Sequence, residues 1–212
     1  HNSDRRQRQM CIRDSTMILK PSKEAPLNAF ILADIIHGCG LPAGVFNLVS
    51  GHGREIGEVI SSHPEVDMVS FTGSTSAGVS VSKAASETVK RVTLELGGKS
   101  ANIILDDADI AKASKMAVYS CFNNSGQECS SLSRLLVPAS HRDEIVNIIA
   151  STMERYSVGD PMDEAIKCGP MVSESQQKSV SEYISLGISE GATLISGGEG
   201  LPCLLYTSPS PR

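Results

Sequence analysis

The chain has 212 residues, of which 40% are hydrophobic and 20% charged, and its mean hydropathy of −0.06 is typical of a globular protein with room for one or two domains. No apolar run approaches the roughly 20 residues that a membrane-spanning helix needs, so we expect no membrane partner. The net charge of −5, from 19 basic and 24 acidic residues, argues against nucleic acid as a partner.

The two ends of the chain carry related coding patterns. The letters at 10–15, Met-Cys-Ile-Arg-Asp-Ser, can be encoded by DNA whose reverse complement, in a shifted reading frame, encodes Cys-Leu-Leu-Tyr-Thr, the letters at 203–207. Such an inverted repeat is typical of translated adapter DNA, so we predict that residues 1–15 and 203–212 are not native. The alternatives for the basic start at 5–8 are a solvated tail, a nucleic-acid-binding arm or a transit peptide. Without both ends, five Arg and two Asp are lost, which leaves 14 basic and 22 acidic residues and a charge of −8.

From residue 16 onward, short apolar runs alternate with longer helical stretches, a pattern typical of βαβ units and a parallel sheet. Pro26 stands where a first helical turn tolerates proline, and Gly38 and Gly40 end the apolar face that follows. The first half of the chain predicts strands at 17–19, 45–49, 68–71 and 92–96 and helices at 26–38, 54–62 and 76–86.

Gly97 and Gly98 follow the fourth predicted strand, and we expect the chain to pass there from one domain to another. The second half predicts strands at 102–105 and 132–137, helices at 109–121, 142–156 and 173–190, and a polar loop at 123–128. The expected fold class is α/β, with domains at 16–97 and 98–202.

Gly51 and Gly53 lie between a predicted strand and a predicted helix, as the glycines of a dinucleotide-binding loop do. The next glycine, Gly57, comes one position later than that motif requires. The loop is therefore either a plain tight turn or a divergent phosphate loop, and the pattern favours the turn.

The segment 71–75, Phe-Thr-Gly-Ser-Thr, joins a predicted strand to a predicted helix. Free backbone N–H groups at a helix start attract a pyrophosphate. Serine and threonine also cap helices that bind no ligand. The local pattern favours a cap, and a pyrophosphate site is the alternative.

Cys129 follows the polar stretch Asn-Asn-Ser-Gly-Gln-Glu at 123–128. A free cysteine is usually buried as a small apolar side chain, so a cysteine among polar neighbours is a candidate reactive thiol. Reactivity requires the thiolate, which nearby positive charge or a helix N-terminus favours. Cys129 is therefore a candidate nucleophile.

Four cysteines remain once Cys11 and Cys203 in the predicted non-native ends are set aside. None forms a C-x-x-C pair and no signal peptide is recognisable, which favours a reducing, cytoplasmic setting and argues against a zinc site. We expect structural roles for Cys39 and Cys121 on apolar helix faces, and we place Cys168 in a loop.

Glu95 stands in the predicted strand 92–96, between Leu94 and Leu96. Strand alternation would turn its side chain outward into solvent. The alternative is a partly buried carboxylate whose raised pKa lets it act as a general base near neutral pH. The local pattern leaves both interpretations open.

Four motifs occur in order: Lys-Pro-Ser at 20–22, Phe-Thr-Gly-Ser-Thr at 71–75, Glu-Leu-Gly-Gly-Lys-Ser at 95–100 and Gly-Gln-Glu-Cys at 126–129. This series, with 34 positions from Glu95 to Cys129, resembles the aldehyde dehydrogenase superfamily. Residues 169–172 and 191–194 are similar to the part of those enzymes that follows the nucleophile. The resemblance covers residues 16–202.

The resemblance implies an oxidoreductase that converts an aldehyde to a carboxylic acid with NAD or NADP. Residues 16–97 would form the last part of a Rossmann-like NAD(P)-binding domain, and 98–202 the first part of a second, catalytic α/β domain. Cys129 would add to the aldehyde, giving a thiohemiacetal and then a thioester. A water activated by Glu95 would hydrolyse the thioester.

The same resemblance implies a set of cofactor-binding residues. Lys20 would contact the adenosine ribose, Ser74 the pyrophosphate, and Gly97 would allow close approach of the nicotinamide. The remaining positions of this set are Ser22, Lys23, Gly53, Phe71, Thr72, Gly73 and Leu96.

Lys23 departs from the pattern of many relatives, which carry a glutamate there that would bind the ribose hydroxyls of NAD. A lysine removes repulsion toward a 2′-phosphate, so NADP is an alternative cofactor, and an exposed lysine without a contact is the other interpretation. The resemblance further implies a homo-oligomer, dimer or tetramer, that acts on a small-molecule aldehyde.

The family's oxyanion asparagine belongs upstream of residue 16 and its nicotinamide-ribose glutamate downstream of residue 202. We therefore expect an internal fragment that is inactive and poorly stable alone. Two rival functions are a CoA-acylating aldehyde dehydrogenase and a non-catalytic dehydrogenase-like scaffold. Glu95 argues against the first, because only hydrolysis needs a water-activating base, and the presence of both Cys129 and Glu95 argues against the second.

Overall fold

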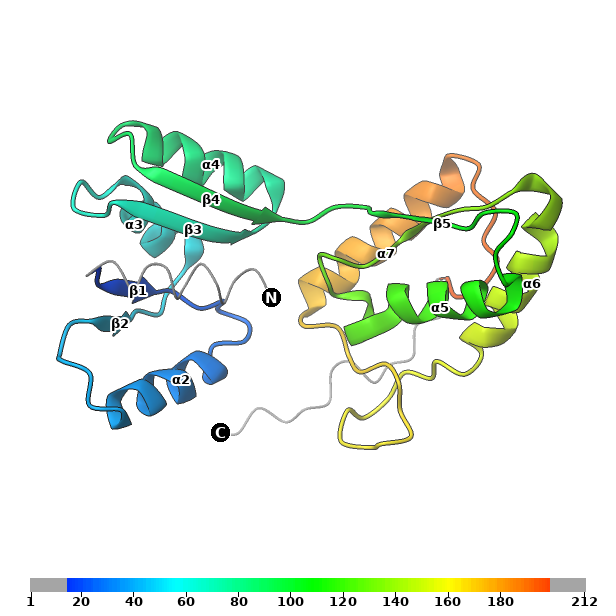
Figure 1. The fold of residues 1–212 in the computed structure, drawn as a ribbon, viewed down its shortest axis with the longest axis horizontal. Coiled ribbons are helices and arrows are strands. Elements are labelled where there is room, and N and C mark those ends of the chain that lie inside the picture. The colour runs from blue at the N-terminus through cyan, green and yellow to red at the C-terminus, as the bar shows by residue number, and fades with distance from the viewer. Residues whose placement is uncertain (1–14, 199–212) are drawn as a thin grey trace. The chain divides into compact units, whose positions relative to one another are not determined.

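The structure, a computed structural model, describes residues 15–198 (Figure 1). Contacts between backbone positions divide the chain into two compact units, with the division between Leu96 and Gly97. The boundary predicted from the sequence lies one residue later. Of the predicted non-native ends, residues 1–14 and 203–212 lie outside the described residues.

The first unit begins with a βαβ unit formed by β1 (Met17–Leu19), α2 (Leu27–Gly38) and β2 (Phe46–Leu48). The two strands pair in parallel, with Leu19 opposite Leu48. Parallel strands need a crossover connection, which α2 supplies. The residues that follow β1 and β2 therefore meet at one edge of the strand pair.

A second βαβ unit consists of β3 (Met68–Gly73), α4 (Thr75–Ser86) and β4 (Arg91–Leu96). A π-helical turn (Gly53–Gly57) and the short helix α3 (Glu58–Ser62) precede it. The two strands of 6 residues pair in parallel along their whole length, so they also end together. In Figure 1, α3 and α4 lie beside this strand pair.

Small residues let α4 approach the β3–β4 pair closely. Gly78 of α4 is buried, and a Cβ atom there would lie 2.8 Å from Cδ2 of Leu96. Ala85 of the same helix is fully buried, and Val69 of β3 is 8% exposed. Because the helix packs along the strands in this way, its first turn stands beside the strand ends.

The apolar side of α2 is present as predicted but is largely exposed. Leu27 is 74% exposed and Ile31 60%, and Ala29 is the one buried residue of the helix. Paired strands lie about 4.8 Å apart. The two strands beside α2 therefore offer too little area to cover its apolar face.

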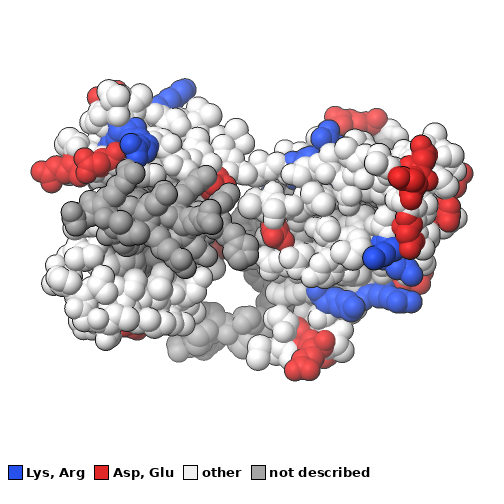
Figure 2. Space-filling model, viewed as in Figure 1, with Lys and Arg blue, Asp and Glu red and all other residues white. Residues whose placement is uncertain are grey.

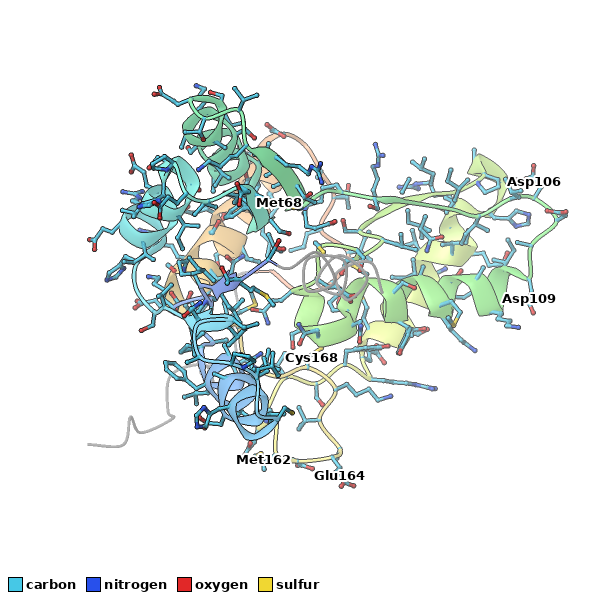
Figure 3. The ribbon with its side chains drawn as sticks, turned by 60° about the vertical axis from the view of Figure 1, so that its left-hand side comes forward. Met68, Asp106, Asp109, Met162, Glu164 and Cys168 are labelled. Carbon is cyan, nitrogen blue, oxygen red and sulfur yellow. The ribbon has the colours of Figure 1, made fainter. Side chains whose placement is uncertain are left out.

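Between residues 97 and 198, the second unit combines a parallel strand pair with three α-helices. Its strands are β5 (Ala101–Ile103) and β6 (Arg134–Leu136), and its helices are α5 (Ile110–Phe122), α6 (Arg142–Met153) and α7 (Glu174–Ser189). Short 3₁₀ turns at Asn123–Gly126 and Ala139–His141 follow α5 and precede α6. Asp109, which Figure 3 labels, caps α5, because its carboxylate accepts the N–H of Lys112 at 3.0 Å.

The core of the second unit lies between α5 and α6. Ile145 of α6 is 1% exposed, and Val118 and Ser114 of α5 are also buried. Ser114 tolerates burial because its hydroxyl donates to the carbonyl of Ile110 at 2.7 Å. This helix pair supports the turn Asn123–Gly126, which continues directly from α5.

The structure confirms the predicted α/β fold with parallel strands. The main differences between the predicted and the observed elements concern where individual strands and helices begin and end. The strand expected at 132–137 is limited to Arg134–Leu136, since the N–H of Ser133 bonds back to the carbonyl of Ser131 at 3.0 Å. The helix expected to reach 156 ends at Met153, where the following N–H groups bond three residues back instead of four.

Charges of both signs share the surface of the second unit. On the face shown in Figure 2, Asp and Glu side chains are spread over this unit beside a smaller group of Lys and Arg side chains. Among residues 15–198, no helix combines the length and apolar character that crossing a membrane would require. The same residues contain no group of three or more His, Cys, Asp or Glu side chains that could hold a metal ion.

Candidate functional site

The end of β3 and the start of α4 form the first part of the candidate site. Ser74 stands at the N-cap with extended backbone, and its Oγ accepts the N–H of Ala77 at 3.3 Å. Its carbonyl accepts the N–H of Gly78 at 2.9 Å. The first N–H groups of a helix have no helical partner, so those of Thr75 and Ser76 are the ones that this cap leaves for a ligand. The cap favoured by the sequence pattern is therefore present.

The chain passes directly over an aromatic ring before this helix. A Cβ atom at Gly73 would lie 2.5 Å from Cζ of Phe71, so a larger residue would displace the ring. Thr72, between them, is exposed. These three predicted cofactor residues shape the edge at which β3 ends, and their contact with a cofactor stays a prediction.

A second edge lies where β1 and β2 end. The Nζ of Lys20 donates to the carbonyl of Pro21 at 2.7 Å and to that of Gly51 at 3.4 Å, which links the segments that follow the two strands. The N–H of Val49 also bonds to the carbonyl of Leu19 at 3.0 Å. An ammonium group has three donors, and the bonds of Lys20 to described residues use two of them.

Ser22 and Lys23 follow Lys20 in an exposed turn. The hydroxyl of Ser22 accepts the N–H of Glu24 at 3.2 Å, and Nζ of Lys23 lies 3.1 Å from the Glu24 carboxylate. The Lys23 side chain is 63% exposed. An exposed pair of this kind contributes little to stability. Lys23 can therefore leave Glu24 for another anion with little loss of free energy.

The two glycines of the predicted tight turn differ in their surroundings. Gly51 has a φ of +154°, and a Cβ atom there would lie 2.7 Å from Cγ1 of Ile56. Gly53 begins the π-helical turn, and no described atom lies within 4 Å of a Cβ built on it. The turn itself therefore requires a glycine at 51, while the space beside 53 is open.

Glu95 and Leu96 are the last residues of β4 and of the first unit, and Gly97 begins the second unit. Glu95 lies opposite Thr72 and its side chain is exposed, in agreement with strand alternation. Leu96 packs against Gly78. No described atom lies within 4 Å of a Cβ built on Gly97, so the described protein atoms do not themselves require a glycine there.

Cys129 lies in an exposed turn of the second unit. The residues before it have left-handed backbone, with φ of 49° at Asn124, 58° at Ser125 and 74° at Gly126. This conformation costs about 1–2 kcal/mol for each residue that is not glycine. Other interactions must therefore hold the turn that leads to the thiol.

Glu128 is the immediate neighbour of Cys129. Its two carboxylate oxygens accept hydrogen bonds from Ser130 Oγ at 2.8 Å and from Asn123 Nδ2 at 2.9 Å. These bonds, that from Ser130 first, hold the pKa of the Glu128 carboxyl below its usual value. The group is therefore a negative charge beside the thiol at neutral pH, and its bonds connect the two ends of the turn.

Two side chains bind the turn to a segment more than forty positions further along the chain. Ser125 donates to the carbonyl of Gly169 at 3.1 Å. Gln127 accepts the N–H of Val172 at 2.8 Å and donates to the carbonyl of Pro170 at 3.4 Å. Neither partnership was predictable from the residues around Ser125 and Gln127, although Gln127 belongs to the Gly-Gln-Glu-Cys motif.

The other described cysteines have different surroundings. Cys168 is 5% exposed, and its burial raises the pKa of the thiol. Burial also raises the pKa of the half-buried Cys121, against a smaller opposing effect of Lys99. Cys39 is exposed, contrary to the predicted apolar helix face, because it follows the last residue of α2 as its C-cap. Exposure is thus shared by Cys129 and Cys39.

The structure gathers the predicted cofactor residues at two strand edges of the first unit. The first edge carries Lys20, Ser22, Lys23 and Gly53, and the second carries Phe71, Thr72, Gly73, Ser74 and Leu96 together with Glu95. Gly97 and Cys129 belong to the second unit.

Comparison with known proteins gives a consistent result. A sequence profile described as "Aldehyde dehydrogenase family" matches residues 11–206. The chain is 52% identical over 187 residues to a 3-succinoylsemialdehyde-pyridine dehydrogenase of Pseudomonas sp, with coverage of 88% of this chain and 39% of that protein. The chain thus spans about two fifths of the length of the curated relatives it matches.

Two solved structures are also similar. One is a variant of aldehyde dehydrogenase C from Pseudomonas syringae in complex with NAD+ and octanal, with a TM-score of 0.86, 48% identity and coverage of 87% of this chain and 38% of that chain. The other is an aldehyde dehydrogenase from Bartonella henselae, with a TM-score of 0.86, 47% identity and coverage of 90% and 40%. Because the family profile matches nearly the whole sequence and these structures share its fold, the chain belongs to the aldehyde dehydrogenase family.

Proposed function

We propose that the full-length protein oxidises an aldehyde to a carboxylic acid with NAD or NADP and that Cys129 is its nucleophile. The observation that carries this proposal is the exposed thiol of Cys129 on a strained, hydrogen-bonded turn in a chain of this family. The chain spans about 39% of a relative, so the activity is proposed for the full-length protein. The similar protein that contains NAD+ and octanal supports the substrate class and the cofactor.

Cys129 supplies the covalent step of the proposed reaction. As thiolate, its sulfur adds to the aldehyde carbon, and the carbonyl oxygen becomes the oxyanion of a thiohemiacetal. Backbone N–H groups of the turn are candidates for holding this oxyanion. A bound nicotinamide supplies the chemistry of hydride acceptance. Loss of the hydride restores the carbonyl and leaves a thioester on Cys129.

Glu95 is proposed to complete the cycle as general base. Its exposed carboxylate takes a proton from a water whose oxygen attacks the thioester carbon. The acid leaves and the Cys129 thiolate returns. The position of Glu95 at the end of β4, on the edge that also carries the predicted pyrophosphate-binding residues, supports this role.

The first unit is proposed as the last part of the NAD(P)-binding domain, and the second as the first part of the catalytic domain, with the predicted extents 16–97 and 98–202. The residues of the first unit fit a dinucleotide. The third donor of the Lys20 ammonium group suits a ribose hydroxyl, and the cap at Ser74 leaves backbone N–H groups for a pyrophosphate. Ser22, Gly53, Phe71, Thr72, Gly73, Leu96 and Gly97 are proposed to complete the cofactor site.

Lys23 is proposed to accommodate the 2′-phosphate of NADP. Its ammonium group is exposed and pairs with the neighbouring Glu24, so it is able to turn toward a phosphate. Replacement Lys23→Glu should lower kcat/KM with NADP relative to NAD by about tenfold, which is the size of one charge-assisted hydrogen bond. Steady-state kinetics with both cofactors measure this ratio, and a strong NAD preference of the unaltered protein would end the NADP proposal.

Aldehyde-dependent formation of NADH or NADPH by the full-length protein tests the proposed function, with octanal as first substrate. Cys129→Ala should lower turnover by roughly a thousandfold or more, since the covalent step is lost. Cys39→Ala removes another exposed thiol and should leave turnover unchanged. Turnover that survives Cys129→Ala would refute the nucleophile. If no turnover is found and Cys129 does not react with thiol reagents, the alternative of a non-catalytic dehydrogenase-like scaffold would be favoured.

Two further properties are proposed for the full-length protein. We infer a homo-oligomer, dimer or tetramer, which light scattering of the purified protein measures directly. We also infer a cytoplasmic setting from four cysteines that are free among the described residues. A signal for export in the full-length reading frame would contradict the second inference.

A further inference from the structure

We propose that Gln127 is a positioning residue whose side-chain amide clamps the nucleophile turn to the segment 169–172 and so sets where the Cys129 thiol stands. The inference rests on the proposed function, because it concerns the same thiol. It extends that function by assigning a role to a residue that itself carries no reaction step. All the contacts involved lie within the second unit.

Both ends of the Gln127 amide are used in this clamp. Its Oε1 accepts the N–H of Val172 at 2.8 Å, across 45 positions of sequence. Its Nε2 donates to the carbonyl of Pro170 at 3.4 Å, across 43 positions, and to that of Asn124 at 3.5 Å. Ser125 adds a second link through Gly169. One side chain thus connects the segment 169–172 with the turn, both at Gln127 itself and at the carbonyl of Asn124, the first left-handed residue.

The segment 169–172 is itself held at both ends, so it can serve as a base for the turn. Before it, the N–H of Cys168 bonds to the carbonyl of Ser157 at 3.2 Å, and its carbonyl accepts the N–H of Gly159 at 3.0 Å. Cys168 is buried, and Figure 3 labels it. After the segment, Ser173 caps α7 by accepting the N–H of Gln176 at 3.3 Å.

The turn needs such a clamp because its backbone is disfavoured. Asn124 and Ser125 both have left-handed φ, although neither is glycine. The free energy lost at each such residue is similar to the contribution of a hydrogen bond or two. Loss of the Gln127 bonds is therefore sufficient to let the turn relax. Because Cys129 stands two residues after Gln127, relaxation moves its sulfur, and a shift of about 1 Å costs up to roughly a hundredfold in rate.

The experiment compares Gln127→Ala and Gln127→Glu in the full-length protein. Gln176→Ala, an exposed glutamine on α7, is the matched control. Iodoacetamide alkylation of Cys129 is followed against pH by peptide mass spectrometry, with the exposed Cys39 as internal standard. Steady-state kinetics with an aldehyde give kcat and KM, and thermal unfolding reports on stability.

With Gln127→Ala we expect kcat to fall about tenfold and the pH profile of Cys129 alkylation to shift, while Cys39 alkylation and the cofactor KM stay unchanged. Gln127→Glu keeps an acceptor for the Val172 N–H but places a carboxylate oxygen against the carbonyls of Pro170 and Asn124, so it should be impaired as well. An unchanged Cys129 profile and kcat after Gln127→Ala would overturn the proposal, even if the unfolding temperature fell. A Gln127→Glu variant with the kcat and the Cys129 profile of the unaltered protein would overturn the role of the amide donor.

The two proposals fail separately in this experiment, because alkylation requires neither aldehyde nor cofactor. If the protein oxidises no aldehyde and Gln127→Ala still alters Cys129 alkylation, the proposed function fails and the clamp stands. If the protein oxidises aldehydes and alkylation is unaltered, the clamp fails and the function stands.

Discussion

Thr72 and Glu95 are register partners in the parallel β3–β4 pair, one residue before both strands end. Parallel pairing brings Glu95 to the edge at which Ser74 caps α4, although 21 positions separate these two residues in the sequence. Ligands of α/β proteins bind at the carboxyl ends of parallel strands. The proposed general base and the proposed pyrophosphate-binding helix start therefore share one edge of the first unit.

Replacement Glu95→Gln should separate the two halves of the proposed reaction. The thiohemiacetal and hydride steps need no base at this position, so a burst of NADH in the first turnover should persist. Hydrolysis of the thioester should slow by roughly 10²–10⁴-fold. Stopped-flow absorbance measures both phases, and Glu87→Gln at the end of α4 is the control. Unchanged steady-state turnover in Glu95→Gln would rule out Glu95 as the base. If the unaltered protein instead requires CoA for turnover, the CoA-acylating alternative would be favoured.

Replacements of Ser74 should distinguish its cap from its proposed contact with the cofactor. Ser74→Ala removes the acceptor for the Ala77 N–H and should cost about 1 kcal/mol of stability. Ser74→Asp keeps a good cap but places a negative charge where a pyrophosphate is proposed. We expect it to preserve the unfolding temperature and to raise the NAD KM several-fold. Ser80→Ala, further along α4, is the control, and an unaltered KM in Ser74→Asp would place the pyrophosphate elsewhere.

The buried thiol of Cys168 should make stability depend on alkaline pH. Burial raises the pKa of this thiol in the folded protein above its ordinary value of 9.0. Its contribution is therefore fully present below that value and is lost as the pH rises through the folded pKa. The free energy of unfolding in urea should fall more steeply above pH 9 in the unaltered protein than in Cys168→Ala. Cys39→Ala should keep the original slope, and three equal slopes would contradict this expectation.

Ser131 and Ser114 offer a matched test of buried hydroxyls. Ser131 is 7% exposed, and its hydroxyl makes no hydrogen bond within the described part of the chain. Ser114 is fully buried, and its hydroxyl donates to the carbonyl of Ile110. Ser131→Ala should raise the free energy of unfolding by about 1 kcal/mol, while Ser114→Ala should lower it by a similar amount. Urea denaturation of both variants measures the difference, and equal destabilisation would contradict it.

The order of strands and helices was predictable because it depends on local periodicity. The predicted helix at 76–86 and strand at 92–96 correspond closely to α4 and β4. Errors arose where a turn competed with the periodic element, as at Ser131, whose carbonyl accepts the N–H of Ser133 and shortens β6. The exposure of Cys39 was missed because helix periodicity does not reveal the last helical residue.

The local features of the candidate site were predictable from the sequence, but its long-range hydrogen bonds were not. The motifs around Ser74 and Cys129 indicated a helix start and a thiol in a polar loop, since both depend on neighbouring residues. The motif containing Gln127 indicated no partner for it, because its partners lie 43 and 45 positions away. Bonds across such distances depend on the path of the whole chain.

By itself, the sequence determined the alternation of elements, the candidate reactive groups and the family resemblance, because these depend on residue type and short-range spacing. Tertiary structure alone decided that Glu95 lies beside Thr72, that Cys168 is buried, and that Gln127 connects the turn before Cys129 to Val172. The physical reason is that burial and long-range hydrogen bonds depend on which segments the folded chain brings into contact.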